Sequence, residues 1–369
     1  MQALFQNVIN SFAEVKNQIT PYIKGLLLYD GRKNCAAMAR KMNVSEKRLR
    51  KQLDNSEVKI KSIQSNLKSI ANETKFIKGL CVFAVDGTSL VKAFAEKIQN
   101  LSIDYDGVIR RPARCLSLMV GALICDGNVI PVDCRFWKNA TKKIGVNKSK
   151  TKKNKKKKKP NKNYKTKIML AIELIQAWKD LIKFNYLAMD GAFSSEKMIE
   201  FIESQKLQYS MRIPRSRRVV IDGKELALRD QPSLKLVRNE RCKSAKGSYK
   251  GYACTFTAHK RKKKNGTWET FFIISNMELS AHGHVIAYSR RWPIDKSFRS
   301  MKQYLGLKDC QMLSGLKQTL HVFNVFLAYS IATVEKIANA KNSVEEIFKI
   351  CRQAKPIQNI SKITDSDVI

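Results

Sequence analysis

Four residues between positions 288 and 302 combine side chains that suit a metal ion and a phosphate. Tyr288, Arg291, Asp295 and Lys302 lie at offsets of 0, 3, 7 and 14. At about 100° per helical residue they share one narrow stripe. Because Pro293 fits best in a first helical turn, the first two residues could instead end one helix while the other two lie on the next. Such a stripe suits either a solvated helix face or a site for a metal and a phosphate backbone.

Two further acids follow short apolar runs. Asp86 comes after residues 80–85, and Asp190 comes after residues 186–189. Continuous apolar runs of this length are typical of buried strands, so each acid is expected where a strand ends. An acid in that place is commonly only a turn residue. A functional role therefore depends on partners elsewhere in the chain.

The composition indicates a polyanionic partner. The 369 residues include 70 Lys and Arg against 31 Asp and Glu, a net charge of +39. Nucleic acid is a better candidate than a membrane, because no basic amphipathic anchor, signal peptide or long apolar span is evident. Residues 138–167 hold 15 lysines and no acid, which predicts a basic disordered loop. That loop is either a solvated linker or a phosphate contact.

Cysteine and histidine offer no competing chemistry. The nine cysteines include no Cys-x2-Cys pair, so reduced thiols are expected rather than a disulfide framework or a zinc site. The four histidines show no metal-ligand spacing. Neither a Ser-His-Asp or Cys-His arrangement nor a phosphate-binding P-loop motif is apparent.

Residues 1–75 show the apolar spacing of helices. Within them, residues 36–53 fit a helix-turn-helix, with Ser45 capping a second helix that exposes Arg48 and Arg50. An ordinary helical hairpin with a charged face fits the same pattern.

The rest of the chain alternates strands and helices. A hairpin is expected over 116–137, helices over 164–184 and 195–205, and a strand over 208–213. Short alternating strands over 216–276 form a β insertion. Helical spacing returns from 280 to 341, and a tail covers 342–369.

The 288–311 stretch resembles a known family. It matches the spacing of the Tyr-x2-Arg-x3-Glu-x6-Lys signature of bacterial insertion-sequence transposases of the DDE, cut-and-paste type. The flanking Arg291-Trp292, Phe298-Arg299 and Gly306-Leu307 look like the same block. The chain departs at the acid, where it has Asp295 and the family has Glu.

This resemblance implies an α/β fold with an RNase H-like catalytic core over 76–215 and 277–341. The β insertion would interrupt that core, and an N-terminal helical DNA-binding domain would recognise the element's ends. Asp86, Asp190 and Asp295 would form one catalytic cluster and hold two Mg²⁺ or Mn²⁺ ions. The partner would be double-stranded DNA, both transposon ends and target, bound by a homodimer in the bacterial cytosol at the nucleoid.

Other residues gain expected roles from the same resemblance. Arg291, Lys302 and Arg212 would hold phosphates of the cut strand, and Tyr288 would donate to a phosphate oxygen. Trp292 and Trp268 would stack on a flipped base, although a tryptophan is more often part of a core. The expected reaction is metal-dependent phosphodiester hydrolysis followed by strand transfer at terminal inverted repeats. The alternatives are an inactive or domesticated DNA-binding derivative, or a structure-specific nuclease without strand transfer.

Overall fold

The chain divides into two compact units. In the computed structural model the described residues are 20–54, 56–73, 79–107, 109–139, 164–263 and 265–353. One unit comprises residues 1–66 and 299–369, and the other comprises residues 67–298. Most of the expected basic loop, residues 140–163, and the end of the expected tail, residues 354–369, lie outside the described residues.

The first unit is helical and combines both ends of the sequence. Its helices are α3 (Pro21–Leu28), α4 (Cys35–Met42), α5 (Glu46–Gln52), α11 (Gly315–Ala338) and α12 (Val344–Gln353). Helices α6 (Glu57–Ala71) and α10 (Pro293–Tyr304) each contain residues of both units. The buried Tyr22 hydroxyl lies 2.8 Å from Nδ1 of His321, which joins α3 to α11. The sequence-based division assigned these C-terminal helices to the core and the tail, whereas here they pack with the N-terminal ones.

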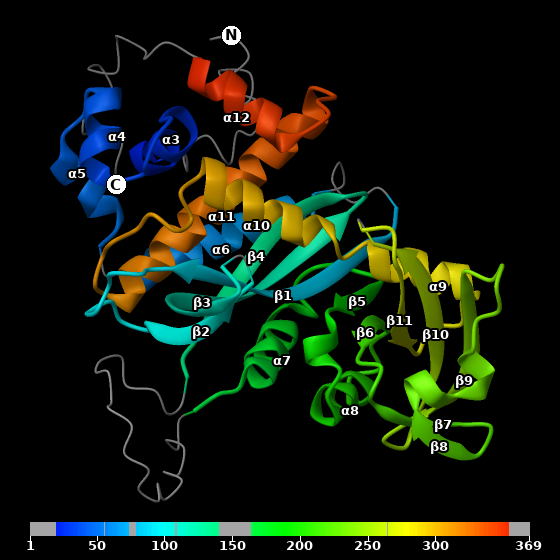
Figure 1. Cartoon of the computed structure of the whole chain (residues 1–369). Coiled ribbons are helices and arrows are strands. Elements are labelled where there is room, and N and C mark those ends of the chain that lie inside the picture. Colours follow the sequence, from blue (N-terminus) through cyan, green and yellow to red (C-terminus); the bar gives the residue numbers. More distant parts are fainter. Residues whose placement is uncertain are drawn as a thin grey trace, which may run out of the picture. The chain divides into compact units, whose positions relative to one another are not determined.

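The second unit is built on one mixed sheet (Figure 1). Its strands are β1 (Cys81–Val91), β2 (Ser102–Asp106), β3 (Arg111–Cys125), β4 (Asn128–Trp137), β5 (Tyr186–Met189), β6 (Tyr209–Ile213), β7 (Arg218–Ile221), β8 (Lys224–Ala227), β9 (Cys242–Tyr249), β10 (Tyr252–Lys262) and β11 (Trp268–Ser275). Strands β1, β5 and β6 are parallel neighbours, while β3 pairs antiparallel with both β1 and β4.

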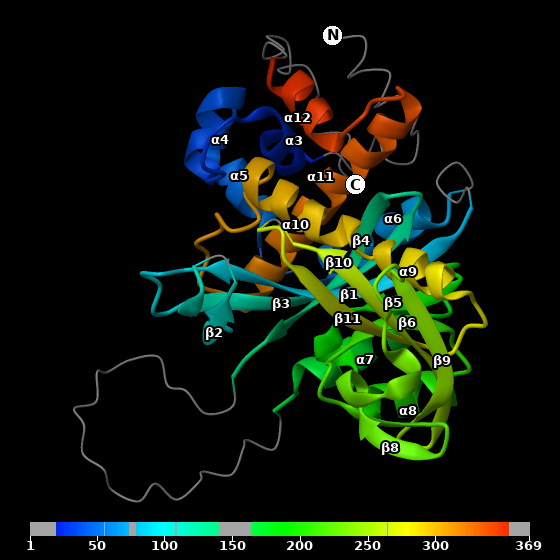
Figure 2. The ribbon, with the colours of Figure 1, turned by 45° about the vertical axis from the view of Figure 1, so that its right-hand side comes forward.

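The strands of the β insertion continue this same sheet. β11 pairs with β6, and β10, β9 and β7 follow outward in order (Figure 2). The insertion is therefore an extension of the central sheet rather than a separately folded layer.

Helices cover both faces of the sheet. Helices α7 (Lys167–Trp178) and α8 (Glu196–Ser204) lie on one face, and α9 (Ala281–Ser289) lies on the other (Figure 1). Successive side chains of a strand point to opposite faces of the sheet, so each buried strand packs against the helices on both faces. On β6, Tyr209 is oriented toward the α8 side, and Arg212, three residues further on, faces α9 with Ile273.

Two sequence expectations are corrected here. β1 does not end at Asp86 but runs on to Val91, because the longer β3 supplies partners along this stretch. Asp86 nevertheless lies just beyond the last residue of β1 that pairs with β5. The expectation of reduced thiols is wrong for Cys81 and Cys125, which form a disulfide. They are separated by 44 residues but lie directly opposite each other on β1 and β3, a register that residue spacing does not reveal. The other seven cysteines are free thiols.

No helix within the described part of the chain is both long and apolar enough to cross a membrane.

Candidate active site

Parallel pairing makes Asp86 and Asp190 neighbours. Each acid immediately follows the last residue that joins β1 to β5. Each carboxylate also accepts a hydrogen bond from the next residue's backbone: Asp86 Oδ1 from Gly87 N–H and Asp190 Oδ1 from Gly191 N–H, both at 2.7 Å. These bonds fix the two side chains at the same edge of the parallel strands.

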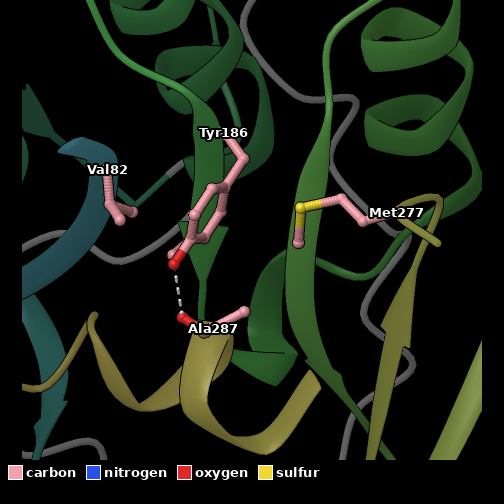
Figure 3. Packing of buried hydrophobic residues seen from close by; sticks show 5 residues of the cluster. Val82, Tyr186, Met277 and Ala287 are labelled. Atoms are coloured by element: carbon pink, nitrogen blue, oxygen red, sulfur yellow. Dashed lines mark hydrogen bonds between the residues drawn. The ribbon is translucent and has the colours of Figure 1, made fainter. Parts of the chain in front are cut away.

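Helix α9 packs on the sheet through both apolar and polar contacts. Val82, Tyr186, Met277 and Ala287 pack together, and the Tyr186 hydroxyl donates to the Ala287 carbonyl at 3.0 Å (Figure 3). The fully buried His284 adds polar anchors. Its Nδ1 lies 2.8 Å from the Thr257 hydroxyl, and its Nε2 lies 3.1 Å from the Met277 carbonyl oxygen. These contacts fix the position of α9 on the sheet, and with it the position of its last turn.

That last turn carries Tyr288. The ring is buried against Phe271 and Ile273 of β11, and its hydroxyl donates to Asp190 Oδ1 over 3.5 Å. Burial raises the pKa of Tyr288, and the Asp190 carboxylate acts in the same direction. The phenol therefore stays protonated and remains a donor at neutral pH.

Arg291 occupies the turn between α9 and α10. Its side chain is buried, and its Nη1 donates to Asp86 Oδ2 in a short ion pair. Nη2 donates to Asp295 Oδ2 at 3.0 Å. Burial alone would lower the pKa of Arg291, but the carboxylates of Asp86 and Asp295 outweigh that effect and raise it. One guanidinium thus links Asp86 of β1 to Asp295 of α10.

Pro293 explains the local geometry. It begins α10, as expected for a proline in a first turn, and residues 290–292 form the turn that separates α10 from α9. Tyr288 therefore ends one helix and Asp295 lies on the next, in agreement with the second arrangement expected from the sequence. Asp295 is the most accessible of the three acids, with 55% of its side chain exposed.

The acids influence one another electrostatically. Burial raises the pKa of Asp86 to about 6, and the carboxylates of Asp295 and Asp190 push it in the same direction. Arg291 and the Gly87 N–H act oppositely but do not cancel the rise. The three carboxylates therefore carry more negative charge than the Arg291 guanidinium alone compensates.

Carboxylate oxygens are the donors that Mg²⁺ and Mn²⁺ prefer, so the chemistry of this donor set fits a hard divalent cation. The conformation is not that of a closed metal site. Among the described residues, no group of three or more His, Cys, Asp or Glu side chains is arranged to hold a metal ion. Arg291 is bonded to two of the three acids instead.

Comparison with known proteins supports a DNA-processing role. Residues 8–269 match the family described as DDE superfamily endonuclease, which is most of the chain. The chain belongs to the DDE superfamily endonucleases. No curated protein sequence matches it. The matched residues include Asp86 and Asp190 and stop before Asp295. Membership implies a nuclease- or transposase-type enzyme that acts on DNA, in a family that usually uses divalent metal ions.

The other expected site residues of this DDE endonuclease fall into two groups. Arg212 is close to the acids, because it lies beside Gly191 and 5.9 Å from the Phe271 ring that packs on Tyr288. Lys302 lies two turns beyond Asp295 on α10. Trp292 is exposed in the turn that also holds Arg291.

Trp268 is not part of this cluster. It lies three residues from Phe271 on β11, so the two side chains point to opposite faces of the sheet. Its exposed ring is flanked by Arg241 and Lys260, at 5.5 and 5.8 Å from the ring centre. Phe271, which contacts the site from the α9 face, was missed in the sequence. The continuous apolar run of residues 271–274 is the signal that could have marked it.

The helix-turn-helix candidate forms two helices, α4 and α5, joined at Asn43 in a left-handed conformation. Ser45 is the N-cap of α5, as expected, but its side chain makes no capping hydrogen bond. Arg48 and Arg50 are both exposed. Arg50 also bonds Glu46 on the same helix at 2.6 Å.

Proposed function

We propose that this DDE endonuclease is the transposase of an insertion sequence. It would bind the element's terminal inverted repeats and catalyse metal-dependent phosphodiester hydrolysis and strand transfer. The observation that carries the proposal is the Arg291 bridge, which ties Asp86, just past the β1–β5 pairing, to Asp295 on α10. The neighbouring Asp190 is bonded to Tyr288 from the same signature stretch.

In this proposal Asp86, Asp190 and Asp295 hold two Mg²⁺ or Mn²⁺ ions. When bound, such ions activate a water or 3′-hydroxyl and stabilise the leaving oxygen of the phosphodiester. Arg291 would bind a phosphate of the cut strand through two N–H groups, which suits guanidinium geometry. Arg212 would hold a further phosphate of the same strand in the same way, Lys302 would act there as a point charge, and the Tyr288 phenol would donate to a phosphate oxygen.

The catalytic core proposed here is RNase H-like. The supporting features are the antiparallel pairing of β3 with β1 and β4, the parallel β1, β5 and β6, and two acids in register just past the β1–β5 pairing. In this arrangement the third acid arrives on a helix after the sheet is complete, as Asp295 does on α10.

End recognition is assigned to the helical pair α4–α5. The exposed Arg48 and Arg50 on the second helix are suited to base edges in a major groove. A homodimer on paired DNA ends would bring two catalytic sites together, and the site of action would be the bacterial nucleoid. The net charge of +39 favours stable association with DNA.

Trp292 and Trp268 are assigned to stacking on an unpaired base. Both are large apolar residues that remain exposed, Trp292 at 43% and Trp268 at 48%. Base–aromatic stacking is tolerant of sequence and would suit a nucleotide displaced near the cut.

Asp295 favours a second candidate. It is one methylene shorter than the glutamate of the signature and is half exposed, while a guanidinium holds one of its oxygens. These features fit a catalytically inactive or domesticated DNA-binding derivative. A nuclease that cuts DNA structures without strand transfer would use the same acids.

A cleavage assay on the natural substrate separates these functions. The DNA flanking the coding sequence is searched for short inverted repeats, and a labelled duplex carrying one repeat is incubated with the full chain and Mg²⁺ or Mn²⁺. Cleavage at the repeat boundary and joining of the end to a plasmid would support the transposase. Cleavage without joining would indicate the nuclease, and binding without cleavage would indicate the derivative.

A further inference from the structure

Both oxygens of the Asp86 carboxylate already have partners. Oδ1 accepts the Gly87 N–H at 2.7 Å, and Oδ2 accepts Arg291 Nη1. Asp295 Oδ2 accepts the other amino group of the same guanidinium at 3.0 Å. A cation that binds these acids must therefore compete with Arg291 for the same oxygens. It would also be repelled by the guanidinium charge at close range.

Arg291 has an unused donor in this position. Its Nε is buried and has no hydrogen-bond partner among the described residues. A buried donor without a partner costs free energy that a new acceptor would recover. A phosphate diester offers such acceptors, and a guanidinium can bind it through two parallel N–H groups.

The backbone around Arg291 can stay in place while its guanidinium moves away from the carboxylates. The turn that carries Arg291 is bounded by α9, which is anchored to the sheet, and by Pro293 at the start of α10. The Tyr288 ring lies 6.0 Å from the guanidinium carbon and offers a face for the charge. A rotation of the side chain alone could therefore exchange carboxylate partners for a phosphate.

We propose that Arg291 guards the acids until DNA arrives. In the DNA-free chain it neutralises Asp86 and Asp295, and a DNA phosphate must take its guanidinium before the acids can bind divalent ions. This inference rests on the proposed metal-dependent function of the site. It makes DNA and metal binding mutually reinforcing, since each favours the state in which Arg291 has left the carboxylates. Metal loading would then be confined to chains that already hold a phosphate backbone.

The affinity of the DNA-free chain for Mn²⁺ tests the guard role of Arg291 directly. Mn²⁺ is titrated into the full chain, and free Mn²⁺ is followed by electron paramagnetic resonance. Arg291→Gln removes the charge and keeps a hydrogen-bonding side chain, so it should bind Mn²⁺ roughly tenfold or more tightly than the unaltered chain. Arg290→Gln is the matched control, because Arg290 is the preceding arginine, is only partly buried, and donates to the Leu80 carbonyl oxygen rather than to an acid of the site. It should leave the affinity unchanged. Equal or weaker Mn²⁺ binding by Arg291→Gln would overturn the inference.

A second arm does not depend on that variant's folding. A short mixed-sequence duplex is added to the unaltered chain, and the Mn²⁺ bound by duplex alone is subtracted. The duplex should raise the affinity of the unaltered chain, and Asp190→Asn should reduce the gain. Failure of the duplex to change the affinity would contradict the guard role while leaving the metal site intact. Absence of Mn²⁺ binding in every form, with and without duplex, would remove the proposed function as well.

Discussion

The Tyr288 hydroxyl donates to Oδ1 of Asp190, 98 positions away in the sequence, across 3.5 Å. The same oxygen accepts the Gly191 N–H at 2.7 Å, so the phenol is the weaker of two donors. The ring itself is buried against Phe271 and Ile273. Tyr288 therefore has two separable contributions, one to packing and one to the orientation of the acid.

Removing only the hydroxyl should separate these contributions. Tyr288→Phe keeps the ring in its pocket, so the free energy of unfolding should change by less than about 1 kcal/mol. DNA cleavage should fall, because Asp190 loses a donor and the phosphate loses a contact. Tyr288→Ala should in addition cost about 3–5 kcal/mol of stability, as aromatic truncations in a core do. Thermal unfolding and end cleavage measured on both variants check this. Equal cleavage by Tyr288→Phe and the unaltered chain would restrict Tyr288 to packing.

The side chain of Asp295 is one methylene shorter than the glutamate of the signature, and lengthening it tests whether the site is active. If the enzyme is active, its site is fitted to Asp295, and Asp295→Glu should leave end cleavage unchanged or lower it, because an added methylene overfills the site. If the chain is an inactive derivative, Asp295→Glu should instead raise cleavage from an undetectable level. The assay is cleavage of a labelled end duplex with Mg²⁺ and separately with Mn²⁺. The direction of the change distinguishes the two candidate functions.

The second helix of the α4–α5 pair is expected to read sequence. Replacing Arg48 and Arg50 together by Ala should weaken binding to the specific end more than to random duplex, because base-edge contacts carry specificity. Titrations with both duplexes at one salt concentration measure this. Equal losses on both duplexes would reduce α5 to a phosphate contact, and unchanged binding would exclude it from the interface. Lys41→Ala on the neighbouring helix is a matched control for the loss of exposed charge.

Lys33 should make the stability of the helical unit depend on pH. Only 2% of Lys33 is exposed, its Nζ has no hydrogen-bond partner among the described residues, and burial lowers its pKa to about 7. Between pH 7 and its ordinary value near 10.4, the unfolded chain keeps a proton that the folded chain has lost. The Lys33 contribution to the free energy of unfolding should therefore rise with pH across this window.

Lys33→Met removes that dependence. The variant should gain stability on the order of a few kcal/mol at pH 7 and little above pH 10. Calorimetric scans of the variant, the unaltered chain and the exposed-site control Lys41→Met at pH 7 and 9.5 check this. A gain that does not shrink with rising pH would show that Lys33 is not buried in its neutral form.

The sequence predicted the elements that carry the site because local patterns determine them. Apolar runs before Asp86 and Asp190 predicted the strands, and β5 has the bounds expected from residues 186–189. Pro293 indicated, as one of two arrangements, the break between the helix of Tyr288 and the helix of Asp295. These features depend on neighbouring residues alone, so spacing is sufficient to find them.

What the sequence did not predict depends on long-range pairing. The ion pair between Asp86 and Arg291 joins residues 205 positions apart. It was missed because Arg291 was interpreted only as a phosphate ligand. The Cys81–Cys125 disulfide follows from the β1–β3 register, and the joining of α11 to α3 follows from tertiary packing. No periodicity within a segment contains this information.

We propose that Asp86, Asp190 and Asp295 act together in metal-dependent cleavage of DNA. The most direct test is cleavage of the labelled end duplex by the single variants Asp86→Asn, Asp190→Asn and Asp295→Asn, with Mg²⁺ or Mn²⁺ and with DNA binding measured in parallel. Each variant should lose cleavage by roughly 100-fold or more, because each replaces a charged ligand at a site that requires exact placement. DNA binding should persist in all three. Full cleavage by any one of them would contradict the claim for that acid, and full cleavage by all three would contradict the assignment of the site.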